Sequence, residues 1–249
     1  MHAYDQAGRP VYQVPNTSKG GMRTTTISDC RKLGLVPSVT EIIGQLDKPA
    51  LLQWKVGKIL ASAFEHQLDC HKGFDTWCRL VQGEVTQEAK KAPELGSAIH
   101  DALESFYDEE SAYNGKYFDH VQKVTYCVQN DVGDYKYIAE ASFAHPLGFG
   151  GKVDLHAKQN VGIVLDFKTK DTTDTAKMKG YKEHIMQLAA YREGLGIPNA
   201  RCFNLFISTK DPSILMLQEY SEKDLGDAWA MFKCLLAYWQ IANKMPVRL

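Results

Sequence analysis

The chain lacks several patterns that define large classes of protein. Its six cysteines are scattered over 249 residues and form no C-x-x-C pair, which argues against a zinc ribbon or a cysteine-rich cluster and favours reduced thiols. No apolar run approaches the roughly 18 residues that a membrane span needs. Residues 1–6 have neither the basic start and apolar core of a secretion signal nor the Arg-rich composition of a transit peptide. We therefore expect a cytoplasmic protein with no membrane partner.

An overall excess of charge of either sign is also lacking. The formal net charge is −1, so composition alone does not indicate a polyanionic partner. The charges are nevertheless unevenly spread. Residues 1–60 carry eight Lys or Arg against four acids, residues 168–182 carry five Lys against two acids, and residues 101–119 carry six acids against one Lys. Such runs are compatible with solvated faces and with contacts to phosphate.

The first half of the chain has the composition of an irregular start followed by helices. Residues 1–36 are rich in Gly, Thr, Ser and Pro, and we expect an irregular segment there with at most a short strand. Residues 37–249 are expected to form one domain whose helical part covers about 37–132. The predicted helices are 38–46 behind a capping box at Ser38, 49–64 with Pro49 in its first turn, 74–91, 93–107 beginning at Pro93, and 119–132.

After residue 132 the apolar pattern changes from a period near 3.6 to a period of 2, which indicates strands. We predict a sheet core over about 133–220 and a last helix over about 221–243, capped by Ser221. The order of elements is typical of an α/β core with a helical N-terminal part. The predicted strands are 135–144, 152–157, 162–168, 201–208 and 214–220, with a helix at about 175–194.

The most informative residues are Asp154, Asp166 and Lys168. Residues 152–157 and 163–168 alternate apolar with polar side chains, as half-buried strands do, and a short segment suited to a hairpin joins them. If the strands pair, Asp166 and Lys168 leave one face of their strand and Asp154 projects beside them. Two close carboxylates repel unless a cation neutralises them, and Mg²⁺ or Mn²⁺ prefers oxygen ligands. Such an ion polarises a phosphate and activates a water, while a nearby Lys offsets developing charge. The pattern predicts a nuclease site.

Four short motifs, in order and at fitting spacing, extend this pattern. They resemble the G-x-x-x-H helix, the G-x-x-D strand, the D/E-x-K strand and the Q-x-x-x-Y helix of the PD-(D/E)XK nuclease superfamily. The resemblance is to its RecB-like exonuclease branch, which includes phage exonucleases and the mitochondrial genome maintenance exonuclease. Each motif alone is weak, whereas the ordered set is specific. The motifs are Gly96-Ser97-Ala98-Ile99-His100, Gly151-Lys152-Val153-Asp154, Asp166-Phe167-Lys168-Thr169 and Gln187-Leu188-Ala189-Ala190-Tyr191.

The resemblance covers residues from about 37 to 208 and implies a restriction-endonuclease-like core, in which helices flank a mixed central sheet. It also implies a bound Mg²⁺ or Mn²⁺, one or two ions. The implied metal ligands are the side chains of His100, Glu140, Asp154 and Asp166 and the backbone carbonyl of Phe167. From its place beside the apolar stripe of its helix, His100 would otherwise be interpreted as a core histidine.

The remaining implied roles concern the substrate. Lys168 would position the attacking hydroxide. Gln187 and Tyr191, four residues apart, share a helix face and would contact the substrate backbone or support Lys168. Thr169 and Lys170 would contact the substrate.

Two departures from relatives narrow the prediction. After the core the chain has only Cys202 and Cys234, so the iron–sulfur cluster of some relatives is not expected, and no Gly-Lys pair lies in a phosphate loop, so no ATP motor is expected. The sequence predicts a free-standing metal-dependent exonuclease that acts on single- or double-stranded DNA ends in phage or bacterial recombination, repair or replication. It would work in the host-cell cytoplasm if phage-encoded, with or without a recombination or replication partner protein. The alternatives are a structure-specific or restriction-like endonuclease of the same fold and a catalytically silent DNA-binding protein.

Overall fold

The computed structural model describes residues 1–16, 18, 20–109 and 113–248, and of residues 88, 90–92 and 109 the backbone alone. The chain divides into two compact units. The first, here called the sheet unit, comprises Met1–Gln45 and Ile99–Leu249. The second, here called the hairpin unit, is Leu46–Ala98.

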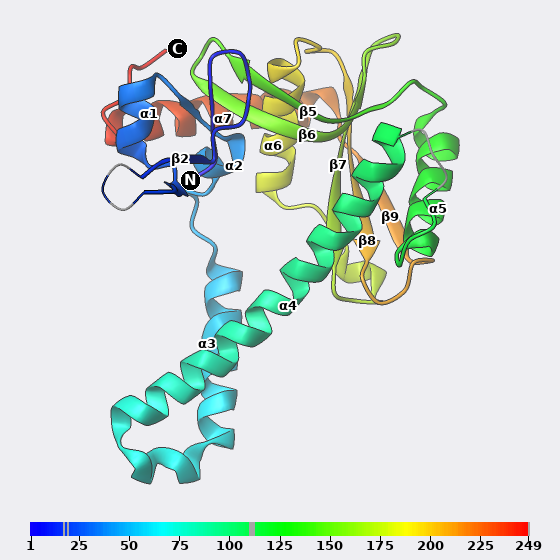
Figure 1. The fold of residues 1–249 in the computed structure, drawn as a ribbon. Helices are drawn as coiled ribbons and strands as arrows, with labels where there is room; N and C mark the ends of the chain where they lie inside the picture. Colours follow the sequence, from blue (N-terminus) through cyan, green and yellow to red (C-terminus); the bar gives the residue numbers. More distant parts are fainter. Residues whose placement is uncertain (17, 19, 110–112, 249) are drawn as a thin grey trace. The chain divides into compact units, whose positions relative to one another are not determined.

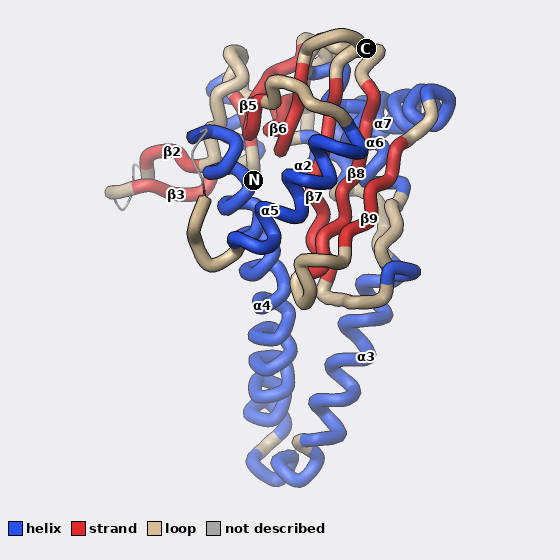
Figure 2. Tube along the Cα trace, turned by 90° about the vertical axis from the view of Figure 1, so that its right-hand side faces the viewer, coloured by secondary structure: helices blue, strands red, loops and turns tan. Residues whose placement is uncertain are grey.

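The sheet unit is built on a five-stranded sheet in the order β5-β6-β7-β8-β9. Neighbouring strands pair antiparallel except for β7 and β8, which are parallel, and the strands run side by side in Figure 2. The α/β fold with a mixed central sheet is thus confirmed, and each predicted strand is present with shifted ends. The strands are β5 (Ile138–His145), β6 (Phe149–Ala157), β7 (Ile163–Lys170), β8 (Arg201–Ser208) and β9 (Leu215–Glu219).

Helices cover both faces of this sheet (Figure 1). On one face, the ring of Phe143 in β5 contacts Tyr191 of α6, and Phe149 of β6 contacts Phe232 of α7. On the other face, the end of α4 and α5 pack on buried residues such as Leu155 and Leu165. The helices are α2 (Val39–Ile43), α4 (Phe74–Glu109), α5 (Phe118–Cys127), which continues into the π-helix η2 (Val128–Val132), the short 3-10 helix η3 (Thr175–Lys177), α6 (Lys182–Gly194) and α7 (Glu222–Ala242).

The N-terminal segment is more regular than its composition predicted. Thr26 and Asp29 form a capping box at the start of a helix, and Gly34 ends that helix in the left-handed conformation that glycine adopts at little cost. Arg23 donates two hydrogen bonds to the carboxylate of Asp29, at 2.6 and 2.8 Å. The expectation of an irregular segment over 1–36 was therefore wrong. Its elements are β1 (Ala3–Tyr4), β2 (Gln13–Pro15), β3 (Met22–Thr24), α1 (Ile27–Leu33) and β4 (Val36–Pro37).

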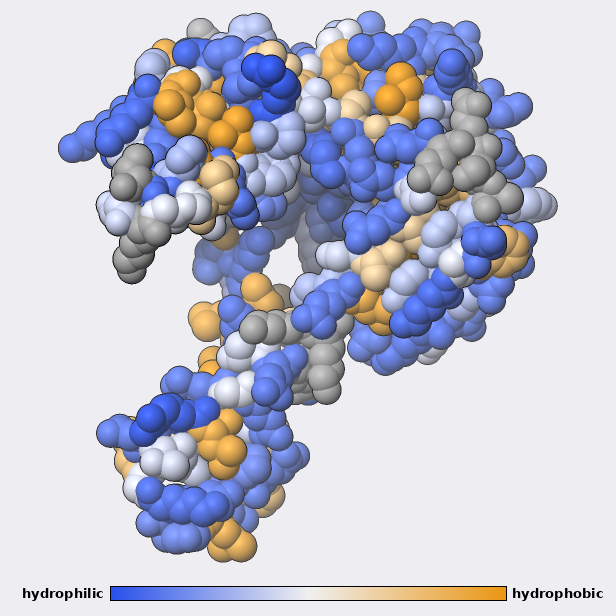
Figure 3. Space-filling view, in the orientation of Figure 1, coloured by the Kyte–Doolittle hydropathy of each residue, from blue (hydrophilic) through white to orange (hydrophobic). Residues whose placement is uncertain are grey.

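The hairpin unit consists of α3 (Pro49–Glu65), the 3-10 helix η1 (Gln67–Lys72) and the first part of α4. Pro93 was predicted to begin a helix, but it lies inside α4, which runs on without a break. A proline inside a helix removes one backbone hydrogen bond and its ring crowds the carbonyl four residues earlier, so α4 continues past Pro93 at a local energetic cost. Trp54 and Phe64 of this unit are 42% and 72% exposed, and apolar patches mark this surface in Figure 3.

The close contact between β5 and α6 gives the first testable prediction. A Cβ added at Gly194 would overlap the ring of Phe143, which is buried. We expect Gly194→Ala to destabilise the protein by about 1–3 kcal/mol, because the ring cannot move without disturbing the packing around it. Gly226→Ala in α7 is the matched control: a Cβ there meets nothing within 4 Å, and alanine favours a helix by up to about 1 kcal/mol. Equal stabilities for the two variants in urea unfolding would contradict this packing.

Candidate functional site

The candidate site lies where β6 and β7 separate. Their backbone pairing runs from Ala157 and Ile163 to Leu155 and Leu165. One residue further, the Asp154 carboxylate replaces the backbone pairing: its Oδ2 accepts a hydrogen bond of 2.8 Å from the amide N–H of Phe167. The predicted pairing of these two strands is therefore present. It brings Asp154 beside Asp166, on the register expected of an antiparallel pair.

Asp166 is the most buried acid of the site, with its side chain 2% exposed. Its Oδ2 lies 2.7 Å from Nζ of Lys168 and accepts a hydrogen bond of 2.8 Å from Nδ2 of Asn204. Asn204 is the register partner of Asp166 on the parallel strand β8. Because both polar groups face Oδ2, the orientation of this carboxylate is fixed from two sides.

Lys168 is held between β7 and α6. Its ammonium donates a hydrogen bond of 3.0 Å to Oε1 of Gln187, and Nε2 of Gln187 donates one of 2.7 Å to the hydroxyl of Tyr191. Gln187 and Tyr191 are 9% and 4% exposed, so their contacts are with the protein. Of the two roles that the resemblance implied for this pair, the geometry favours support of Lys168 over contact with a substrate backbone.

His100 lies on α4 next to Asp154. Its Nδ1 is 3.6 Å from Oδ2 of that carboxylate, its side chain is 30% exposed, and its ring meets Phe167 edge to face. This position suits a ligand to an ion held by Asp154 better than a buried core histidine.

Glu140, a predicted metal ligand, contacts a lysine. It forms an ion pair with Lys152, and it lies on β5 between the register pairs that join Ala139 to Leu155 and Ala141 to Val153, which puts it opposite Asp154. Its φ of 50° is strained for a residue other than glycine. Glu140 therefore lies opposite Asp154 on the neighbouring strand, and Lys152 balances its charge.

The two substrate-binding predictions on β7 lie at different places. Thr169 alternates with Lys168 along the strand, on the side of buried Phe167. Nζ of Lys170 lies 4.8 Å from the centre of the Tyr181 ring, and burial, followed by the charge of Lys168, lowers the pKa of Lys170. Among the cations that follow the site, Lys177, Lys179 and Lys182 are exposed.

Burial raises the pKa of Asp166 well above its ordinary value of 3.8, and repulsion from Asp154 adds to this, while Lys168 and Asn204 act in the opposite direction. The pKa of Tyr191 also rises, mainly through burial and then through the negative charges of Asp166 and Asp154. Both shifts are thus caused first by burial, which disfavours the charged form of each group.

Within the described part of the chain, no group of three or more His, Cys, Asp and Glu side chains is close enough to hold a metal ion. As these side chains stand, a metal would rely on the two aspartates and on backbone oxygen, and His100 and Glu140 would have to move to join them. Both carboxylates make their contacts with the described residues through Oδ2, which leaves Oδ1 of each for another partner. Hard oxygen donors of this kind fit Mg²⁺ or Mn²⁺.

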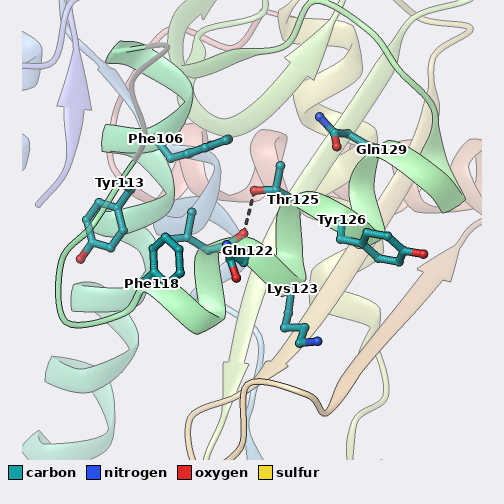
Figure 4. A pocket seen from close by; sticks show the side chains of 9 residues that line it. Phe106, Tyr113, Phe118, Gln122, Lys123, Thr125, Tyr126 and Gln129 are labelled. Atoms are coloured by element: carbon teal, nitrogen blue, oxygen red, sulfur yellow. Dashed lines mark hydrogen bonds between the residues drawn. The ribbon is translucent and has the colours of Figure 1, made fainter.

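A cavity of about 500 Å³ lies elsewhere in the sheet unit, against α5. Figure 4 shows it lined by rings from α4, α5 and the segment between them, including Phe106, Tyr113, Phe118 and Tyr126. None of the predicted site residues lines this cavity, which is therefore separate from the candidate site.

Comparison with known proteins gives distant similarity only. No protein-family model matches the sequence, and neither does any curated protein. The crystal structure of SSO0001 matches 47% of this chain and 56% of that chain, at 16% identity and a TM-score of 0.29. An alkaline exonuclease, LHK-Exo from Laribacter hongkongensis, matches 49% of this chain and 68% of that chain, at 16% identity and a TM-score of 0.31. Likeness of this degree carries no argument about function. In the described residues, no helix is long and apolar enough to cross a membrane.

Two site residues were missed from the sequence, Asn204 and Tyr220. The hydroxyl of Tyr220 donates a hydrogen bond of 2.8 Å to Oδ1 of Asn204, whose amide contacts Asp166. The sequence signal was one polar residue inside the otherwise apolar run 202–207. A buried asparagine in a central strand needs hydrogen-bond partners, and this could have drawn attention to it.

Proposed function

We propose that this protein is a metal-dependent deoxyribonuclease that hydrolyses DNA from its ends. The observation that carries the proposal is the position of Lys168. Its ammonium is fixed between the Asp166 carboxylate and the Gln187 amide, and Asp154 lies across the gap between the separating strands. This combination of two carboxylates and one ammonium suits phosphodiester hydrolysis.

The residues present fit a divalent cation. Asp154 and Asp166 would hold it, with the carbonyl of Phe167 and the imidazole of His100, and with Glu140 if Lys152 is displaced. The fit rests on the pairing of two carboxylates with a single ammonium and on the Oδ1 atoms, which make no hydrogen bond or ion pair with a described residue. When bound, Mg²⁺ or Mn²⁺ polarises the scissile phosphate and makes a water more acidic.

The protein's own residues then perform the remaining tasks. Lys168 places one positive charge beside the reacting phosphate and offsets negative charge that develops there. Gln187 and Tyr191 hold Lys168 in one position, because the amide is itself hydrogen-bonded and buried. The Phe167 amide holds Asp154 in one rotamer. Preorganised groups of this kind lose little free energy to reorientation during the reaction.

DNA as the substrate is supported by the cations that follow the site. Lys177 and Lys179 are exposed on the segment that leads into α6, and Lys182 is exposed at its first residue, where they can meet backbone phosphates. Contacts to phosphate carry no sequence information. We therefore propose a nuclease with little base specificity and with binding that weakens as salt rises.

The test compares linear DNA labelled at one end with covalently closed circular DNA, in the presence of Mg²⁺, Mn²⁺ or EDTA. We expect the wild type to degrade linear DNA only with a divalent metal and to leave the closed circle intact. The variant Asp154→Asn should lose nearly all of this activity, because the two-carboxylate site then has one charge fewer. Metal-independent cleavage, or full activity of Asp154→Asn, would refute the proposed site.

The same experiment separates the alternatives. Cleavage of the closed circle would identify an endonuclease, because such DNA offers no end. DNA binding with no product under any metal condition would identify a catalytically silent binding protein. A role in phage or bacterial recombination, repair or replication, Mg²⁺ or Mn²⁺ as the cofactor and a cytoplasmic location are parts of the same proposal.

A further inference from the structure

Asp166 is held by a chain of two further side chains, Asn204 and Tyr220, that reaches from its carboxylate to the residue just after β9. Tyr220 donates to Oδ1 of Asn204 at 2.8 Å, and Nδ2 of Asn204 donates to Oδ2 of Asp166 at 2.8 Å and to the Asp166 carbonyl at 3.3 Å. We propose that Asn204 and Tyr220 are positioning residues that set the metal affinity of the site by fixing the Asp166 carboxylate. This inference rests on the proposed metal-dependent function.

Asn204 and Lys168 together define the geometry around the Asp166 carboxylate. Asn204 is fully buried, and it contacts both the side chain and the backbone of its register partner. Together with Lys168 it occupies Oδ2. The other oxygen, Oδ1, then faces away from these donors, so rotation of the carboxylate is opposed by the loss of two charge-assisted hydrogen bonds.

The Tyr220 hydroxyl sets the orientation of the Asn204 amide. An amide presents an oxygen at one end and an N–H₂ group at the other, and only the N–H₂ end attracts a carboxylate. Asn204 Oδ1 can only accept a hydrogen bond, so the Tyr220 hydroxyl must donate to it. Tyr220 therefore keeps the N–H₂ group turned towards Asp166.

Tyr220 is itself held by its neighbours. Its hydroxyl lies directly against Gly180, where any added Cβ would overlap it. The amide N–H of Gly180 donates a hydrogen bond of 3.0 Å to Oε1 of Gln218 on β9. The backbone N–H of Tyr220 donates a hydrogen bond of 3.1 Å to the carbonyl of Cys202 on β8. Tyr220 is thus held by its backbone beside β8 and by the packing of its hydroxyl against Gly180.

Groups that orient a metal ligand without touching the metal typically change metal affinity by about 10- to 100-fold when removed. We expect Asn204→Leu to weaken Mn²⁺ binding by about 10-fold and Tyr220→Phe by about 3-fold. The tyrosine variant has the smaller effect because the carboxylate alone still favours the N–H₂ end of the amide. Both effects should be absent from a merely structural residue.

The test measures binding of Mn²⁺ alone to the DNA-free full chain by isothermal titration calorimetry. Tyr137→Phe is the matched control, because it removes a partly buried tyrosine hydroxyl that donates to the Gly133 carbonyl at 2.8 Å, away from the site. A second readout is hydrolysis as a function of Mn²⁺. The variants at Asn204 and Tyr220 should need more metal, and saturating Mn²⁺ should restore their rate to within about 3-fold of the wild type.

The outcomes are separable. Mn²⁺ affinity within about 2-fold of the wild type for both site variants would overturn the positioning role. If Asn204→Leu does not fold, Tyr220→Phe decides alone, and unchanged Mn²⁺ affinity in that variant overturns the role. Failure of the proposed function would instead appear in the wild type, as no Mn²⁺ binding or no metal-dependent hydrolysis, and it would remove the positioning role with it.

Discussion

Lys168→Ala is expected to slow metal-dependent DNA hydrolysis by about 100- to 1,000-fold, the typical effect of losing one group that stabilises transition-state charge. The ammonium is held at 2.7 Å from Asp166 and 3.0 Å from Gln187, and alanine removes the positive charge from that position. The loss should appear in kcat more than in KM, because the ammonium acts on charge that develops during the reaction. Single-turnover kinetics on end-labelled DNA measure it directly.

Lys158→Ala is the control for this variant. Lys158 is an exposed lysine just after β6, so its loss removes the same charge without touching the site. Its rate should stay within about 3-fold of the wild type. Equal rates for Lys168→Ala and Lys158→Ala would show that Lys168 takes no part in the chemistry.

Asp166→Asn is expected to give the second large effect. The variant should be more stable than the wild type without metal and less stable than the wild type with metal. Burial raises the pKa of Asp166 above its ordinary value of 3.8, so the ionised carboxylate opposes folding when no metal is bound. Asparagine keeps an oxygen for the Asn204 amide and carries no charge. In EDTA at pH 8 we expect the variant to be more stable than the wild type, by on the order of 2 kcal/mol.

The direction of the pH dependence follows from the raised pKa. The contribution of Asp166 to stability is fully present below pH 3.8, where the group is protonated in both folded and unfolded chains. It is lost as the pH rises through the raised folded-state value, because only the unfolded chain then ionises without cost. The stability difference between wild type and Asp166→Asn should therefore grow as the pH rises from 4 towards neutrality.

Added Mn²⁺ should reverse the order. A ligand at 100 times its Kd stabilises the folded state by about 2.7 kcal/mol, and the wild type should gain this while Asp166→Asn gains little. Asp171→Asn, which changes an exposed carboxylate just after β7, should follow the wild type in both conditions. Thermal unfolding in EDTA and in Mn²⁺ measures all three proteins. Parallel shifts of wild type and Asp166→Asn with metal would refute a role for Asp166 in binding it.

Local patterns predicted most of the sheet unit, because its signals lie within short stretches of sequence. Alternating or continuous apolar residues located all five strands of the central sheet, and the capping residue Ser221 located the start of α7. The prediction of a helix start at Pro93 was wrong, because a proline favours the first turn of a helix but does not exclude the interior of one. The capping box of Thr26 and Asp29 was overlooked because the Gly, Thr, Ser and Pro content of residues 1–36 as a whole favoured an irregular segment.

The parts of the candidate site that come from strands adjacent in the sequence were predictable, and the parts that come from distant elements were harder to predict. Asp154, Asp166 and Lys168 come from one hairpin, so spacing alone brought them together. The contact of Gln187 with Lys168 was accessible only through the motif resemblance. Asn204 was not found, because its pairing with Asp166 depends on the parallel register of β7 and β8. Glu140 was located on its strand, whereas its ion pair with Lys152 depends on side-chain directions that no pattern encodes.

The most direct test of the account is the location of a bound metal ion. Crystals of the wild type soaked in Mn²⁺ should show an anomalous scattering peak between the carboxylates of Asp154 and Asp166, at about 2.0–2.6 Å from an oxygen of each, the range of hard divalent cations. Asp166→Asn crystals treated in the same way should lack it. A peak that lies away from both aspartates, or one that persists in Asp166→Asn, would contradict the proposed site.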